Sequence, residues 1–129
     1  MDHHGVRRER GAAIADFAMV SGLVTLVFVA VFQVGLAMHI RNTLISCASE
    51  GARLGARADA APEEGAARAR QLIARSISAT FAQDVSASVE TVDGVGVVAV
   101  HVRAPLPVIG PFGPDGRLDV VGRAYLESQ

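Results

Sequence analysis

One uninterrupted apolar stretch, from Phe17 to Ile40, holds no Asp, Glu, Lys or Arg. As a helix, roughly 24 residues at about 1.5 Å rise span about 36 Å, and the hydrocarbon core of a bilayer is about 30 Å thick. The Val, Phe and Thr of this stretch would favour a strand in water. In lipid, however, a single segment must satisfy its own backbone hydrogen bonds, and only a helix does so. The stretch therefore predicts one membrane-spanning helix.

Composition limits what the rest of the chain can do. Outside the apolar stretch about a hundred of the 129 residues remain, enough for one small domain. The formal net charge is −1, so there is no electrostatic footprint for nucleic-acid binding. Nothing groups Ser, His and Asp as nucleophile, base and orienting group, and His3 and His4 form no metal-ligand motif. We therefore expect no enzyme, cofactor, metal ion, small-molecule substrate or nucleic-acid partner.

The arginines near the N-terminus predict the orientation in the membrane. Arg7, Arg8 and Arg10 lie close together before the apolar stretch, whereas the arginines after it are widely spaced and mixed with acids. Positive charge beside a membrane helix stays in the cytoplasm. We therefore expect the N-terminus inside and the C-terminus outside.

Asp16 lies at the edge of the apolar stretch, five residues after Gly11. It has two interpretations. It either caps the N-terminus of the helix and complements the helix dipole, or it is a costly charge at the membrane edge that is kept for a partner. Spacing alone favours the cap.

Cys47 is the only cysteine, which excludes a disulfide within the chain. The simplest interpretation is a small buried apolar residue. The alternatives are a link between chains and a lipid-modified cysteine, since residues 44–47 (LISC) resemble the lipobox of bacterial lipoproteins. A signal peptide cut near Ala48 is a further alternative, but the apolar run exceeds the roughly 7–15 residues of such a signal.

The first helix is expected to continue beyond Ile40, because no proline occurs before Pro62. Gly51 and Gly55 are four residues apart within this part. Each glycine costs a helix about 1 kcal/mol relative to Ala, so the pair favours close approach of another helix. The alternative is a soft helix that frays there.

A second, amphipathic helix is predicted over residues 63–83, after the helix-starting Pro62. Its arginines lie mostly away from its apolar face. That face consists of Leu72, Ile73, Ile77 and Phe81.

A small antiparallel sheet is predicted from alternating apolar residues. Strands are expected over 85–92 and 98–103, joined by a hairpin turn at Asp93-Gly94, and over 117–127. His101 is expected to face outward from its strand, and prolines and glycines predict a loop over 105–116. The expected fold class is α+β, with a long N-terminal membrane-spanning helix, a second amphipathic helix and about three strands.

Three features together resemble a known family. A basic leader ends in RRERG and is followed by AAIADFA and the apolar run. The segment IRNTLISCASEGARLGA comes next, and a β-rich tail ends in VVGRAYLES. These features resemble the TadE-like family of the tight-adherence (Flp) pilus system, the minor pilins or pseudopilins of bacteria. The resemblance spans roughly residues 7–127.

The resemblance implies a precursor in the cytoplasmic membrane that a prepilin peptidase cuts after Gly11. Ala12 then becomes the mature N-terminus, and Asp16 takes the fifth mature position, followed by Phe17. Type IV pilins generally have Glu at that position, so this chain departs by one methylene group. Pilin relatives often also have Pro a few residues into the apolar run, where this chain has Ser21-Gly22.

The resemblance also implies a structural protein, either in the membrane or in an extracellular pilus. Its partners would be other pilins and pilus assembly proteins. Residues 1–11 form a cytoplasmic leader, 12–61 the transmembrane and extended helix, and 62–129 an exterior α+β domain.

Two rival interpretations differ in the mature N-terminus. A membrane-anchored accessory protein that binds an envelope partner would keep Met1. A lipoprotein would begin at a lipidated Cys47, and the pilin at Ala12.

Overall fold

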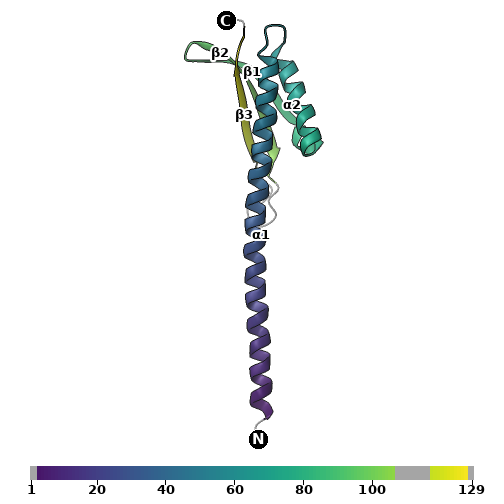
Figure 1. Ribbon diagram of the computed structural model, residues 1–129, viewed down its shortest axis with the longest axis vertical. Coiled ribbons are helices and arrows are strands. Elements are labelled where there is room, and N and C mark those ends of the chain that lie inside the picture. Colours follow the sequence, from purple (N-terminus) through teal and green to yellow (C-terminus); the bar gives the residue numbers. More distant parts are fainter. Residues whose placement is uncertain (1–2, 107–116, 128–129) are drawn as a thin grey trace. The chain divides into compact units, whose positions relative to one another are not determined.

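A computed structural model describes residues 3–106 and 117–127 (Figure 1). The elements are the helices α1 (His3–Gly55) and α2 (Pro62–Ser76), the 3₁₀ helix η1 (Ala79–Ala82), and the strands β1 (Asp84–Val92), β2 (Val95–Pro105) and β3 (Arg117–Tyr125). The α+β class is therefore confirmed. The chain divides into two units, Met1–Gly35 and Leu36–Gln129.

The first unit is helical throughout its described residues and has an exposed apolar surface. Phe17 and Phe28 are each 75% exposed, and their apolar neighbours along α1 are exposed as well. α1 is the one described helix that is long and apolar enough to cross a membrane. The Val- and Phe-rich stretch is thus helical, as expected for a segment that must satisfy its own backbone hydrogen bonds.

α1 begins earlier than the sequence suggested. It starts at His3 and includes the described part of the leader, where Arg and Glu are good helix formers. Asp16 therefore lies well inside α1, and its interpretation as the N-terminal cap of this helix is wrong. At the other end, α1 stops at Gly55, before the expected limit at residue 61.

The second unit contains an antiparallel sheet of three strands in the order β1-β2-β3. The predicted turn at Asp93-Gly94 is confirmed, because both residues have positive φ, 53° and 81°, as a type I′ hairpin turn requires. β2 ends at Pro105, and the part of the predicted loop over residues 107–116 lies outside the described residues.

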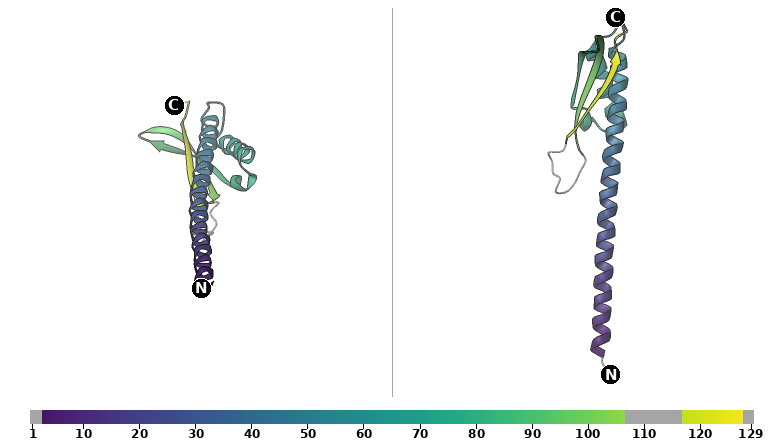
Figure 2. Two further views of the ribbon diagram at one scale, coloured as in Figure 1. Left: turned by 60° about the horizontal axis from the view of Figure 1, so that its bottom comes forward. Right: turned by 90° about the vertical axis from the view of Figure 1, so that its left-hand side faces the viewer.

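The core of the second unit lies between the helices and one face of the sheet. The C-terminal part of α1 and all of α2 lie on the same side of the strands (Figure 2). The buried side chains include Leu44, Ala48 and Ala52 from α1, Ala69 and Ile73 from α2, and Val85, Val100, Val102 and Val120 from the sheet. The period-two alternation read from β2 and β3 therefore separates the inner face from the outer face.

α2 is shorter than predicted, because it ends at Ser76 and does not reach residue 83. The backbone of Ser78 is extended, and its side-chain oxygen accepts a hydrogen bond of 3.2 Å from the Thr80 N–H at the start of η1. Such local side-chain bonds compete with helix propagation. Phe81 therefore lies in η1, although it still packs against the core together with Ile77.

Glycines set the spacing between α1 and its neighbours. A Cβ on Gly51 would collide with the Gly65 carbonyl oxygen and lie 2.9 Å from Ala69 Cβ in α2. A Cβ on Gly122 of β3 would fall on the α1 backbone at Ala48 and Ser49. Neither contact has room for a side chain, so α1, α2 and β3 depend on glycine to pack this closely.

Replacing Gly51 by Ala should destabilise the second unit by about 1–3 kcal/mol, the usual cost of overpacking, although Ala has the better helix propensity. Thermal unfolding of the full chain in detergent, followed by circular dichroism, measures the change. Gly35→Ala is the matched control, because a Cβ there meets nothing within 4 Å. An equally stable Gly51→Ala variant would contradict this packing.

Candidate functional site

The segment from Gly11 to Phe17 lies on the exposed part of α1. Gly11, Ala12, Asp16 and Phe17 are all exposed, and a Cβ on Gly11 would meet nothing within 4 Å. Ala12 and Asp16 are four residues apart, so they lie one turn apart on the same side of the helix. Within the described part of the chain, Asp16 has no ion-pair partner. The segment therefore presents a lone carboxylate where the exposed apolar surface begins.

Gly51 and Gly55 lie where α1 meets α2. A Cβ on Gly55 would approach the backbone of Gly65 and Pro62 to 3.3 Å. Since Gly65 is the reciprocal contact in α2, three glycines bring the two backbones together. Their role here is packing within one chain, which leaves them buried and unavailable to a second molecule in this state.

Cys47 lies in the core of the second unit with 6% of its surface exposed. It is surrounded by the small and aliphatic side chains of the helix–sheet core. The structure thus agrees with the interpretation as a small buried apolar residue. A link to another chain, or lipid modification, would require the thiol to leave this core.

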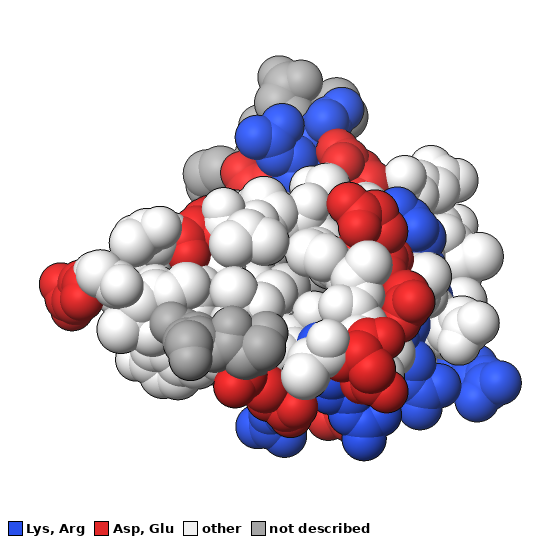
Figure 3. Space-filling model, turned by 90° about the horizontal axis from the view of Figure 1, so that it is seen from above, with Lys and Arg blue, Asp and Glu red and all other residues white. Residues whose placement is uncertain are grey.

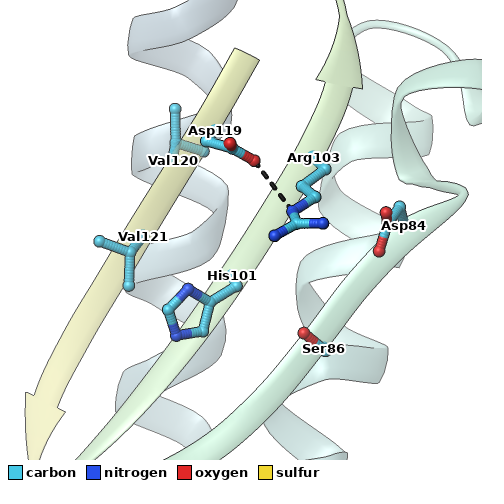
Figure 4. Close-up of a pocket in the computed structure, with 7 residues that line it drawn as sticks. All are labelled: Asp84, Ser86, His101, Arg103, Asp119, Val120 and Val121. Atoms are coloured by element: carbon cyan, nitrogen blue, oxygen red, sulfur yellow. Dashed lines mark ion pairs between the residues drawn. The ribbon is translucent and has the colours of Figure 1, made fainter. Parts of the chain in front are cut away.

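A polar hollow of about 530 Å³ lies on the outer face of the sheet (Figure 4). Its lining consists of Asp84, Ser86, His101, Arg103, Asp119, Val120 and Val121. Arg103 Nε lies 3.1 Å from Asp119 Oδ1, which joins β2 to β3. His101 is on this outer face, where the alternation of its strand predicted it.

Glu90 connects all three strands on the same face. Its Oε1 lies 3.2 Å from His101 Nε2, and its Oε2 lies 3.3 Å from Arg123 Nε. These hydrogen bonds, first to His101 and then to Arg123, lower the pKa of the Glu90 carboxyl group. Ala99 of β2 lies on the same outer face, directly opposite Arg123 of β3. It is fully buried although it faces outward. The charged side chains therefore hold the strands together as cross-strand pairs.

Ser86 and His101 are directly opposite in the β1–β2 register, next to Asp84. The three residue types resemble a nucleophile, a base and an orienting acid. Within residues 3–106 and 117–127, however, no hydrogen bond joins Ser86 to His101, whose Nε2 contacts Glu90 instead. The described residues also contain no group of His, Cys, Asp and Glu that could hold a metal ion. The geometry gives a surface of paired charges without an assembled nucleophile.

Two features escaped the sequence reasoning. Gly122 lies between Val120 and Ala124 on the inner face of β3, so the alternation marked its position without indicating its contact with α1. The pairing of Glu90 with His101 and Arg123 depends on the relative register of three strands, and no local pattern encodes it.

The comparisons with known proteins concern α1. A family model described as TadE-like protein matches residues 11–53. No curated protein and no solved structure matches the chain. The matched segment contains Gly11, Ala12, Asp16, Phe17 and Gly51, and excludes the sheet. The match confirms the resemblance to the TadE-like family, and it associates the chain with the tight-adherence pilus system.

Proposed function

We propose that the chain is a minor pilin-like component of a bacterial tight-adherence pilus, anchored in the cytoplasmic membrane and processed after Gly11. The observation that carries this proposal is the match over residues 11–53, which joins the Gly11–Phe17 segment to the exposed apolar surface of α1. Such a component is a substrate of the prepilin peptidase and not an enzyme.

The apolar surface of α1 supports a membrane location. Burying one large apolar side chain stabilises by about 1.5–3 kcal/mol, and α1 exposes many such side chains in a row. Lipid would cover them before assembly, and neighbouring helices would cover them in a filament. Because Arg7, Arg8 and Arg10 precede this surface, the N-terminus faces the cytoplasm and residues 41–129 face outward.

Asp16 has a role in assembly in this proposal. Cleavage after Gly11 creates an α-amino group at Ala12 with an intrinsic pKa of about 8. A cation among packed apolar helices is costly unless it is paired. Asp16 lies one turn away, and it meets the amino group of its own chain or of a neighbour. Pairing between subunits would neutralise both charges and set their axial register.

The processing step is tested by Gly11→Val. We expect the native chain to begin at Ala12 and the variant to keep its leader, because a larger side chain should not fit the peptidase cleft. Intact-mass measurement of the purified membrane protein gives the result. Gly5→Val is the matched control, since Gly5 also has open space around it, and this variant should be cut normally.

Two outcomes would contradict processing at this position. A native chain that keeps Met1 would favour the membrane-anchored accessory protein. Normal trimming of the Gly11→Val variant would place the cut elsewhere.

The charge pairing is tested by comparing Asp16→Asn with Asp16→Glu. The Asn variant should be inserted and cleaved but fail to co-purify with the other pilus components, because it leaves the new amino group unpaired. The Glu variant should assemble, because it keeps the charge and extends the reach. Co-purification of the Asn variant at native levels would remove the pairing role.

A further inference from the structure

A second hollow, of about 680 Å³, lies where α1 ends, between that end, α2 and the end of β3. We refer to it as the arginine pocket. It is lined by Glu50, Arg53, Leu54, Ala56, Arg57, Arg68, Ala124, Tyr125 and Glu127. All of these residues belong to the second unit.

The two acids of the arginine pocket are already engaged. Glu50 Oε2 lies 3.6 Å from Arg53 Nη1. Glu127 Oε2 accepts a hydrogen bond of 3.3 Å from the Ala58 N–H, and the Glu127 N–H donates to the Ala56 carbonyl oxygen at 3.0 Å. The two hydrogen bonds of Glu127 also connect the chain after β3 to the turn that follows α1. They hold this wall of the pocket in place.

Two arginines in the same pocket have no such partner. Within residues 3–106 and 117–127, neither Arg57 nor Arg68 forms an ion pair. Arg57 is exposed in the turn after α1, and Arg68 is half-buried on α2. The contact of Gly51 and Gly55 with α2 sets the distance between the end of α1, from which the turn with Arg57 begins, and the helix that carries Arg68. Both arginines line the same pocket, so one ligand can contact both while the backbone that carries them stays in place, which reduces the entropic cost of binding.

The charge balance decides which anion fits. The lining has three arginines and two glutamates, an excess of one positive charge. Seen from the end at which α1 terminates, acidic and basic side chains lie next to each other and do not form a block of one sign (Figure 3). A nucleic acid or another polyanion gains affinity from many phosphate contacts, and the glutamates would repel it here. Isolated carboxylates fit better, because a guanidinium group pairs with a carboxylate through two parallel hydrogen bonds.

The remaining lining indicates what flanks these carboxylates. Leu54 and Ala124 provide an apolar wall, and Tyr125 is 69% exposed at the edge. Tyrosine is enriched at protein interfaces because it combines apolar contact with a polar tip. We propose that the arginine pocket binds an acidic segment of a partner protein, with carboxylates on Arg57 and Arg68 and an aliphatic side chain against Leu54 and Tyr125. This inference rests on the proposed function, because a protein that assembles with others needs partner proteins. The inference adds the chemistry by which one of them would be recognised.

Peptide binding to the purified full chain in detergent tests the inference separately from processing and pilus assembly. The probe is a short fluorescein-labelled peptide in which two Glu residues flank a Leu, and the same peptide with Gln is the control. Fluorescence anisotropy should show tighter binding of the Glu peptide, with an affinity that falls as salt screens the charges. Equal binding of the two peptides, or binding of neither, would overturn the proposal.

Variants assign the binding to the pocket. The double variant Arg57→Gln/Arg68→Gln should lose about tenfold or more in affinity, the scale of losing a charge-assisted hydrogen bond. Arg75→Gln is the matched control, because Arg75 is an exposed arginine on α2 outside the pocket, and it should bind as the native chain does. Circular dichroism confirms that each variant is folded. Native affinity in the double variant would overturn the assignment, as would an equal loss in Arg75→Gln.

A truncation tests whether the chain fills its own pocket. Removal of residues 128 and 129 should leave the peptide affinity unchanged. A gain of about tenfold, equivalent to about 1.4 kcal/mol, would mean that the C-terminus of the chain competes for Arg57 and Arg68. That result would overturn the proposal of a partner.

Discussion

The structure depends on one physical constraint, the need to cover the apolar side chains of α1. Between Ile14 and Met38 most of these side chains are exposed on a helix that satisfies its own backbone hydrogen bonds. Exposing such an apolar surface to water is unfavourable, whereas lipid or a bundle of similar helices can cover it. Such a surface suggests a membrane anchor, and the family match over residues 11–53 covers most of it.

The same helix also builds the domain that follows. The second unit begins at Leu36, so the last part of α1 contributes Leu44, Ala48 and Ala52 to the core shared with α2 and the sheet. Gly51 and Gly122 let α2 and β3 approach the α1 backbone so closely that no side chain fits between them. The sequence predicted a domain boundary between residues 61 and 62. The core of the second unit, however, includes α1 residues that lie before that boundary. A domain that begins at residue 62, without the end of α1, would lack one wall of this core.

Much of this fold was predictable from the sequence, because its strongest signals are local. The length of the apolar run predicted α1, Asp93-Gly94 predicted the hairpin, and alternation predicted the inner residues of the strands. The early end of α2 was missed, since the hydrogen bond between Ser78 and Thr80 interrupts an otherwise continuous helical pattern. The sequence did not predict the helical leader either. Its charged residues indicated the orientation in the membrane, and their helix propensity did not enter the prediction.

The candidate sites also fall into two groups, those with a local signal in the sequence and those without one. Gly11 and Asp16 became candidates through the resemblance to a known family, whose features lie along one segment, and the family match covers that segment. The arginine pocket and the pairing of Glu90 with His101 and Arg123 join residues far apart in sequence. Each depends on strand register or on the meeting of α1, α2 and β3. Such sites become visible only once the elements are packed.

In the proposed topology, α1 crosses the cytoplasmic membrane and the second unit folds outside. A reporter enzyme that is active only after export, fused after Gln129, tests this topology. We expect strong reporter activity, and we expect that replacing Arg7, Arg8 and Arg10 by Gln weakens that activity because the cytoplasmic charge is lost. An inactive fusion that is stably produced in the cytoplasm would contradict the orientation, and with it the proposed place of the chain in a pilus.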